Sequence, residues 1–218
     1  MCCVALKLLS VVGLCVQSIF YGIHKNKLYK LAVMHHHLLL VCIDVGILNM
    51  GVICVKVECD ENKEPLRPFV LEVQRIEKID ITAFNAEVKE LAHRMRLFFG
   101  HFKSELDTAD HILVERQPLC GCVAVQELIL YRFPRKTILL SPTQMHKLLR
   151  IRQLSYEQRK MATVCAARHL LQDHQKALKE LESLERKHDV ADAVCLLYFY
   201  LCSITNPFEK FRYRQTTV

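Results

Sequence analysis

Two apolar runs separated by a short glycine-containing stretch are the clearest pattern in the chain. Residues 38–43 are apolar and lead into Asp44 and Gly46, and a second apolar run covers residues 52–57 after Gly51. Short, uninterrupted apolar runs bounded by glycine are typical of buried strands. The pattern therefore predicts a strand that ends near Asp44, a tight turn, and an antiparallel return strand.

The remainder of the chain alternates between short apolar runs and helical periodicity. We predict strands at 68–76, 110–115 and 136–140, with a helix at 83–99 that Gly100 ends and a helix at 122–131. Further helices are predicted at 142–149, 155–171, 175–186 and 189–203. An antiparallel meander of three strands, followed by strands that alternate with helices, indicates an α/β fold with a mixed five-stranded sheet flanked by helices.

The first 23 residues are apolar apart from Lys7, Gln17 and Ser18, which permits two interpretations. The segment is long enough for a signal peptide or a membrane anchor. Alternatively, it is an upstream extension and the working protein begins near Met34. We favour the extension, because eleven cysteines without a C-x-x-C pair and a net charge of +7 suit reduced thiols in a nucleocytoplasmic protein. We therefore divide the chain into an extension, 1–37, and one folded domain, 38–218.

Acidic residues at the ends of predicted elements are the candidates for chemistry. Asp44 ends the first strand, Glu115 ends the strand at 110–115, and Asp189 and Asp192 lie three residues apart at the start of the last helix. Taken singly, Asp44 could cap a turn, Asp189 could be a helix N-cap, and Asp192 could compensate the helix dipole.

Taken together, the same acids suggest a metal site. Sites in open α/β sheets form outside the carboxyl ends of strands. Two like charges about 4 Å apart repel by about 4 kcal/mol, so converging carboxylates need a cation or protons. An all-oxygen ligand set favours Mg²⁺ or Mn²⁺, and a pair of such ions supports phosphodiester cleavage.

Basic residues gather after the last predicted strand, and only Glu157 opposes them. They are Lys147, Arg150, Arg152, Arg159 and Lys160. The cluster could be a solvated face, but beside an acidic metal centre it suits a polyanion such as nucleic acid. Aromatic residues that could stack on opened bases are Phe133, Tyr156 and Tyr213.

Three motifs occur in a fixed order: Ile43-Asp44-Val45-Gly46 with Asn49, then Glu115-Arg116-Gln117, then Asp189-x-x-Asp192-Ala193. Together they resemble the RuvC-like Holliday junction resolvases, most closely those of poxviruses and iridoviruses. The resemblance covers residues from about 38 to the C-terminus. It implies an RNase H-like fold and a homodimer in which each subunit cuts one strand of a four-way junction with Mg²⁺.

The resemblance also implies roles for individual residues. Asp44, Glu115, Asp189 and Asp192 would be the metal ligands, and Lys160 is the best positional match for the lysine that viral members place near the acidic cluster. The extension departs from the family, whose members begin close to the first strand.

The leading hypothesis is therefore a Mg²⁺-dependent endonuclease, with Mn²⁺ as a substitute, that resolves branched DNA during viral genome processing in the host cytoplasm or nucleus. Two alternatives stay open. One is another RNase H-like nuclease that acts on RNA–DNA hybrids or on ends. The other is a non-catalytic basic DNA-binding or membrane-tethered protein, in which the acids only cap turns and helices.

Overall fold

The computed structural model describes residues 36–60, 62, 64–66, 69–84 and 90–205. The N-terminal extension before residue 36 lies outside the described residues, as does the C-terminal segment that contains Tyr213. The predictions for those segments are therefore not addressed by the structure. Within the described ranges, no helix combines the length and apolar character needed to cross a membrane.

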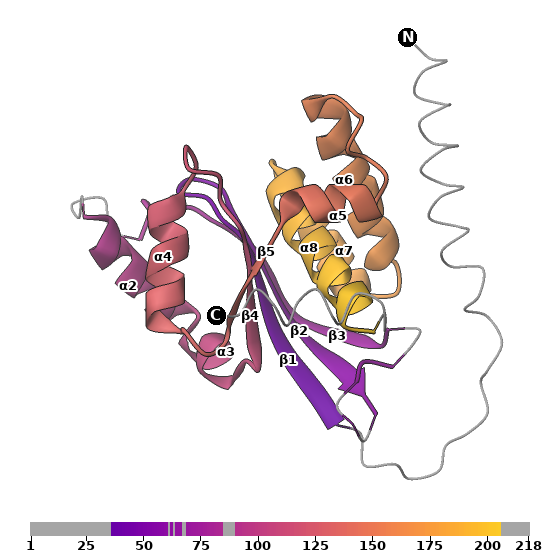
Figure 1. The fold of residues 1–218 in the computed structure, drawn as a ribbon, viewed down its shortest axis with the longest axis horizontal. Helices are drawn as coiled ribbons and strands as arrows, with labels where there is room; N and C mark the ends of the chain where they lie inside the picture. Colours follow the sequence, from indigo (N-terminus) through magenta and orange to yellow (C-terminus); the bar gives the residue numbers. More distant parts are fainter. Residues whose placement is uncertain (1–35, 61, 63, 67–68, 85–89, 206–218) are drawn as a thin grey trace, which may run out of the picture.

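A mixed five-stranded sheet forms the centre of the molecule (Figure 1). Its strands are β1 (His36–Asp44), β2 (Met50–Cys59), β3 (Leu71–Ile79), β4 (His111–Glu115) and β5 (Thr137–Leu140). Their order across the sheet is β3-β2-β1-β4-β5. The first three strands pair antiparallel, whereas β4 runs parallel to β1 and β5 runs parallel to β4. The predicted antiparallel meander followed by parallel strands is confirmed.

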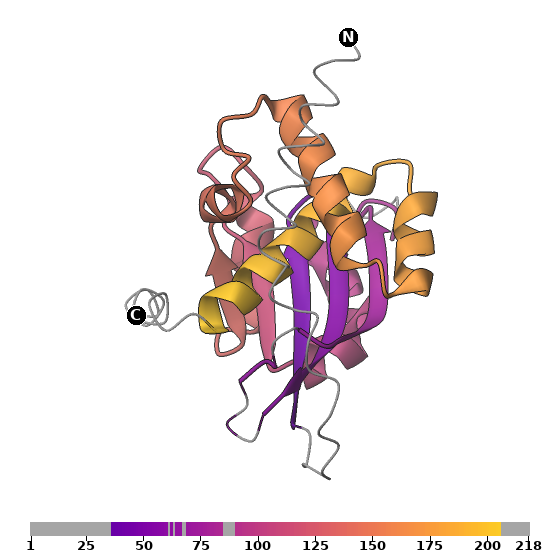
Figure 2. The same ribbon diagram turned by 90° about the vertical axis from the view of Figure 1, so that its right-hand side faces the viewer.

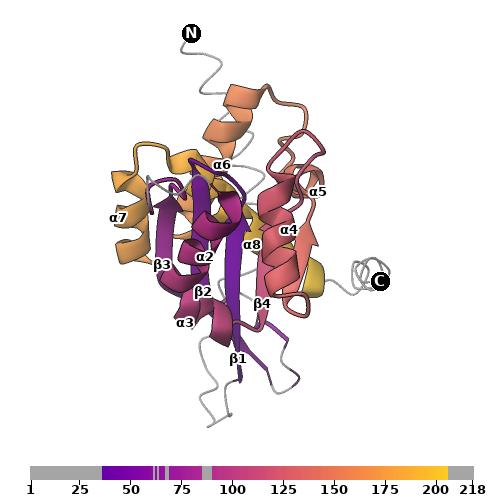
Figure 3. The same ribbon diagram turned by 90° about the vertical axis from the view of Figure 1, so that its left-hand side faces the viewer.

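Helices cover both faces of this sheet. Figure 3 shows one face, which is covered by α2 (Leu91–His101), α3 (Lys103–Thr108) and α4 (Val123–Arg132). The other face is covered by α5 (Pro142–Leu148), α6 (Tyr156–Leu170), α7 (Gln175–Ser183) and α8 (Lys187–Thr205). Figure 2 shows α8 lying obliquely across the strands. The arrangement is a three-layer α/β/α fold.

Alternation along the strands divides the core into two apolar clusters. On β1, Leu40 and Cys42 point to the α8 face, whereas Val41 and Ile43 point to the α2–α4 face. Successive strand residues point to opposite faces, so a strand covered on both sides reads as one continuous apolar run. This explains why most positions of β1 and β2 are apolar. Cys42 is a fully buried free thiol, and a cysteine in this position packs as a small apolar side chain.

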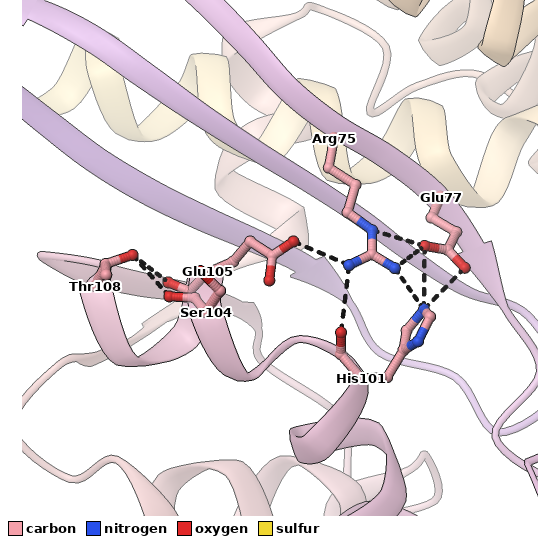
Figure 4. Close-up of polar contacts among 6 residues, drawn as sticks. All are labelled: Arg75, Glu77, His101, Ser104, Glu105 and Thr108. Carbon is pink, nitrogen blue, oxygen red and sulfur yellow. Dashed lines mark hydrogen bonds and ion pairs between the residues drawn. The ribbon is translucent and has the colours of Figure 1, made fainter.

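A polar cluster fixes the helical layer opposite α8 to the edge strand β3 (Figure 4). The Arg75 guanidinium donates to Glu77 and to Glu105, each over 2.9 Å, and lies 4.1 Å from the centroid of the Phe102 ring. The Nε2 atom of His101 lies 3.2 Å from the Glu77 carboxylate. Because Arg75 is on β3 while Phe102 and Glu105 belong to the α2–α3 segment, these contacts join the edge strand to that layer.

Several predicted boundaries are wrong. The third strand runs from Leu71 to Ile79 rather than over 68–76, because Ile79 is buried and still pairs with Met50 on β2. Residues 81–84 form a turn rather than a helix, and the Thr82 N–H donates to the Asp80 carboxylate over 2.8 Å. The helix begins at Leu91 and continues through Gly100, and the short helix α3 that follows was not predicted.

Candidate active site

Asp44 and Glu115 end neighbouring strands and lie side by side. Ile43 on β1 pairs with Val114 on β4 in parallel register, so the next residue on each strand is one of the two acids. Both point to the face that α8 covers, since Cys42 lies two residues before Asp44 and belongs to the cluster on that face, as does Leu113 before Glu115. The structure therefore brings these two predicted site residues together.

The start of α8 lies against β2 at the residue opposite Asp44. That residue is Gly51, which pairs with Asp44 across the antiparallel ladder. A Cβ atom at Gly51 would lie only 2.1 Å from the Asp189 carbonyl oxygen and 2.9 Å from the Val190 Cα. Only glycine permits two backbones to approach this closely. The helix that carries Asp189 and Asp192 is thus placed directly beside Asp44.

Asp189 lies in the first turn of α8, because the helix begins at Lys187. The alternative that Asp189 is the N-cap is therefore wrong. Its side chain is held on both sides: Arg186 Nε donates to Oδ2 over 3.2 Å, and His188 Nε2 lies 3.2 Å from Oδ1. Asp189 is only 8% exposed, so these two neighbours compensate a carboxylate that has little contact with water.

The electrostatics of the site link all four predicted carboxylates. Burial, and then the charges of Glu115, Asp192 and Asp189, hold the pKa of Asp44 well above its usual range. Burial raises the pKa of Asp192 to about 7; the Thr163 hydroxyl opposes this rise, and the charges of Glu115 and Asp189 add to it. Carboxylates that raise one another's pKa form a site with excess negative charge, which favours protons or a divalent cation.

The four carboxylates fit a divalent ion in their chemistry but do not form a closed cage. Within the described residues, no three acidic, imidazole or thiol side chains already converge in the manner of a metal-ligand set. Hydrogen bonds engage all four candidates: Gln117 donates to Glu115 over 2.6 Å, Arg186 donates to Asp189, the Thr163 side chain bonds to Asp192, and Asp44 shares a hydrogen bond with Glu115. The donor atoms are all oxygens, as Mg²⁺ prefers, and burial together with the charges of the neighbouring acids raises the pKa of Asp44.

Lys160 faces the acidic cluster from the neighbouring helix α6. Its positive charge lowers the pKa of Asp192, against the upward effect of burial, and also lowers that of His188. The ammonium nitrogen lies 4.1 Å from the centroid of the Tyr156 ring, a cation–π contact that restrains the side chain. Lys160 therefore acts electrostatically on the acidic cluster, and its assignment as the catalytic lysine stays a prediction.

The predicted DNA-binding residues lie on α5, on the loop after it and on α6. Lys147, Arg150 and Arg152 are exposed, and none of them takes part in an ion pair within the described part of the chain. Arg159 Nη1 donates to the Leu154 carbonyl over 2.7 Å. Lys147, Arg150 and Arg152 are therefore available to an external anion, and the role of all four residues in DNA binding stays a prediction.

The three aromatic residues proposed to stack on bases differ in their positions. Tyr156 is 59% exposed and lies beside Lys160, as a base-stacking role requires. Phe133 packs instead against the apolar cluster on the opposite face, where its ring meets Phe99 at a centroid distance of 5.6 Å. The prediction for Phe133 is therefore wrong, and Tyr213 lies outside the described residues.

Sequence reasoning missed the residues that hold the carboxylates in place. Gln117 donates to Glu115, and Gln126, on α4, accepts from the Gln117 backbone N–H. Both left a signal in the sequence, because Gln117 belongs to the Glu115-Arg116-Gln117 motif and Gln126 is a lone amide on a predicted apolar helix. Arg186 gave no such signal, since it belongs to a charge-rich stretch in which no single cation stands out.

Comparisons with known proteins give matches in structure only. No protein-family profile matches the sequence, and no curated protein matches it. The crystal structure of the fowlpox virus resolvase in complex with Holliday junction DNA matches with a TM-score of 0.58 and 17% identity, over 78% of this chain and 100% of that chain. A second structure, of the fowlpox virus Holliday junction resolvase, matches with a TM-score of 0.56 and 18% identity, over 76% of this chain and 99% of that chain. T. thermophilus RuvC in complex with a Holliday junction is more distant, with a TM-score of 0.47 and 14% identity over 83% of this chain and 98% of that chain. The chain described here therefore has the RNase H-like fold of the fowlpox virus Holliday junction resolvase.

Proposed function

We propose that this chain is a Mg²⁺-dependent, structure-selective endonuclease that cuts four-way DNA junctions. The proposal rests on one observation. Asp44 and Glu115 end adjacent strands, and the start of α8, which bears Asp189 and Asp192, contacts the backbone of Gly51 beside Asp44. The similar fowlpox virus resolvase is known in complex with Holliday junction DNA, which supports branched DNA as the substrate of this chain as well.

In the proposed chemistry, some metal-ligating side chains are fixed by strand pairing and others must change their contacts when an ion binds. Bound Mg²⁺, or Mn²⁺ in its place, would activate a water molecule and stabilise the leaving oxygen of the phosphodiester. Asp44 and Glu115 stand on paired strands, so they hold their positions, whereas Asp189 must leave Arg186 in order to bind an ion. Lys160, whose charge already acts on Asp192, is placed to stabilise negative charge at the phosphate that is cut.

The exposed basic residues would supply affinity for the DNA. Contacts from Lys147, Arg150, Arg152 and Arg159 to phosphates would release counterions, and the choice of a junction over linear duplex would come from shape. A homodimer would let each subunit cut one of the two strands. A viral role in the host cytoplasm or nucleus is the setting that the sequence resemblance implies.

The most direct test replaces Asp44 by asparagine. We expect Asp44→Asn to reduce Mg²⁺-dependent nicking of a labelled four-way junction by more than about 100-fold, because even changes next to metal ligands cost about 10–100-fold. Binding of the same junction in EDTA should stay at the wild-type level. The matched control is Asp173→Asn, the same chemical change at an exposed residue of the loop before α7. If Asp44→Asn cuts at the wild-type rate, the metal role is wrong.

A comparison of substrates separates the alternatives. Linear duplex, an RNA–DNA hybrid and a four-way junction should be offered to the wild-type protein under single-turnover conditions with Mg²⁺. Faster cleavage of the hybrid would identify another RNase H-like nuclease. Junction binding without cleavage of any substrate would favour the non-catalytic DNA-binding alternative.

A further inference from the structure

We propose that Gln117 is a positioning residue for Glu115, and that it connects the metal centre to helix α4 through Gln126. The proposal rests on the proposed nuclease function and names a residue that sets the affinity of that site for its metal. Gln117 follows Glu115 by two residues in the loop between β4 and α4.

The orientation of the Gln117 amide follows from its two partners. Its Oε1 atom accepts from the backbone N–H of Cys122, the N-cap of α4, over 3.1 Å. A backbone N–H can only donate, so the oxygen of the amide must face Cys122 and the NH₂ group must face the other way. There Nε2 donates to Glu115 Oε2 over 2.6 Å. Both ends of the amide are therefore engaged, and one oxygen of Glu115 is held.

A second amide fixes the backbone of Gln117. Gln126 is only 6% exposed on a face of α4 that also buries Val125 and Ile129. Its Oε1 atom accepts from the Gln117 N–H over 2.8 Å, and its Nε2 atom donates to Glu127 over 3.0 Å. A buried polar group without partners costs about 1–3 kcal/mol, so these bonds explain how an amide is tolerated at this position.

The loop is also shaped closely around the Gln117 side chain. A Cβ atom at Gly121 would lie 2.7 Å from Gln117 Oε1, and the Gly121 N–H donates to the Pro118 carbonyl over 2.8 Å. The connection from α4 through Gln126 and Gln117 to Glu115 is therefore continuous. Groups that hydrogen-bond to a metal-ligating side chain restrict its orientation and commonly set the metal affinity of the site.

The neutrality of the amide distinguishes Gln117 from the partner of Asp189. Arg186 brings a positive charge to Asp189 and so competes with a metal ion for that carboxylate. The Gln117 amide is neutral, so it holds one oxygen of Glu115 without cancelling the charge of the carboxylate. Gln117 can therefore stay in place when a cation is bound, as a positioning residue must.

Gln117→Met tests this role, because methionine is of similar length and lacks the amide. We expect the affinity for Mg²⁺ to fall by about 10-fold or more, the usual effect of removing a group that orients a metal ligand. The affinity is obtained by fitting the dependence of the melting temperature on Mg²⁺ concentration and, independently, from the Mg²⁺ concentration that half-saturates junction nicking. The matched control is Gln74→Met on the exposed side of β3, which should leave both values unchanged.

Two further measurements separate positioning from a purely structural role. A residue that only stabilises the loop would change the melting temperature in EDTA and leave the Mg²⁺ affinity of the folded protein at the wild-type value, and that result would overturn the proposal. Junction binding in EDTA should not change in Gln117→Met. If that variant does not fold, Gln117→Asn, which keeps an amide but is one methylene too short to reach Glu115, should show the same loss of Mg²⁺ affinity, and wild-type affinity there would equally contradict the proposal.

The outcome also distinguishes this inference from the proposed function. If the wild-type protein shows neither a Mg²⁺-dependent rise in melting temperature nor junction nicking, the nuclease proposal fails. If the wild type shows both and Gln117→Met matches it, only the role of Gln117 fails.

Discussion

Arg150 has an unusual backbone for its residue type. Its φ angle of 57° is the only positive value at a non-glycine position in the described ranges. The residue follows the last turn of α5, where the Arg150 N–H donates to the Lys147 carbonyl over 3.1 Å and the Ile151 N–H donates to the His146 carbonyl over 2.9 Å. This is the Schellman arrangement, whose left-handed position is usually glycine. An arginine in the left-handed region destabilises the fold relative to glycine, which is consistent with a functional role for its exposed side chain.

Replacing this arginine by glycine should move stability and DNA binding in opposite directions. We expect Arg150→Gly to raise the melting temperature by about 2–4 °C, since relief of left-handed strain gains about 1 kcal/mol. The same variant should bind a four-way junction more weakly, with a salt dependence whose slope is smaller by about one. Arg150→Lys keeps the charge and serves as the control. Unchanged junction affinity in Arg150→Gly, measured over a range of salt concentrations, would remove Arg150 from the DNA-binding surface.

At the scale of elements, the seating of α8 on β2 decides whether the carboxylates meet. The strand pairing fixes Asp44 beside Glu115, but Asp189 and Asp192 arrive only through the helix. Their distance from the strands depends on the contact between the backbone of Gly51 and that of Asp189. A backbone atom cannot rotate away as the end of a long side chain can, so the helix as a whole must shift if this space is filled.

Gly51→Ala should therefore damage the site more than its single methyl group suggests. We expect a loss of about 1–3 kcal/mol in the free energy of unfolding, the usual cost of overpacking, together with a large loss of Mg²⁺ affinity and of junction cleavage. Gly100→Ala is the matched control, because a Cβ there meets nothing within 4 Å. Gly100 lies in the last turn of α2, where the change to alanine should stabilise the protein by up to about 0.5–1 kcal/mol. Urea unfolding and Mg²⁺ titration of both variants measure these effects, and normal metal binding by Gly51→Ala would contradict the importance of this contact.

The elements that sequence patterns predicted well are those whose pattern is local. β1, β2 and β4 are continuous apolar runs because both of their faces are buried, and the positions of Asp44 and Glu115 at the strand ends followed directly. The start of α2 was wrong because Phe84 continues the apolar spacing while it packs from a turn. The helix periodicity around Asp189 and Asp192 predicted α8, but the close contact at Gly51 depends on a helix more than 130 residues further along the chain. No local pattern reports such a contact.

At the scale of the whole molecule, an acidic centre lies on the α8 face of the sheet, at the edge where the carboxyl ends of β1 and β4 meet. The net charge of the full chain is +7, so this centre is a local exception to the overall sign. The cations that oppose it, among them Lys160 and Arg186, come from α6 and from the approach to α8. A fold that gathers negative charge in this way loses stability when the acids ionise without a cation.

This cost should appear as a pH dependence of stability in the metal-free protein. Asp192 has an ordinary pKa of 3.8 and a pKa of about 7 in the folded chain, so the folded state binds more protons between these values. Its contribution to stability is therefore fully present below about pH 4 and is lost as the pH rises through 7, and the raised pKa of Asp44 acts in the same direction. We expect the melting temperature in EDTA to fall between pH 5 and pH 8 by more in the wild type than in Asp192→Asn.

Other titrating groups set the range and the control for this measurement. The pKa values of His111, His146 and His188 are lowered by burial, so these residues make stability rise with pH over the same range, and the difference between wild type and variant removes their contribution. Hydrogen bonds from Arg168 and Lys187 lower the pKa of Glu182 to about 2, so this acid stays ionised above pH 5 and does not interfere. Asp173→Asn should keep the wild-type slope.

Addition of Mg²⁺ should raise the wild-type melting temperature more at pH 8 than at pH 5, because protons compete with the ion at the lower pH. Equal slopes in wild type and Asp192→Asn would mean that ionisation of Asp192 costs the fold nothing, and the acidic centre would then have no need of a cation.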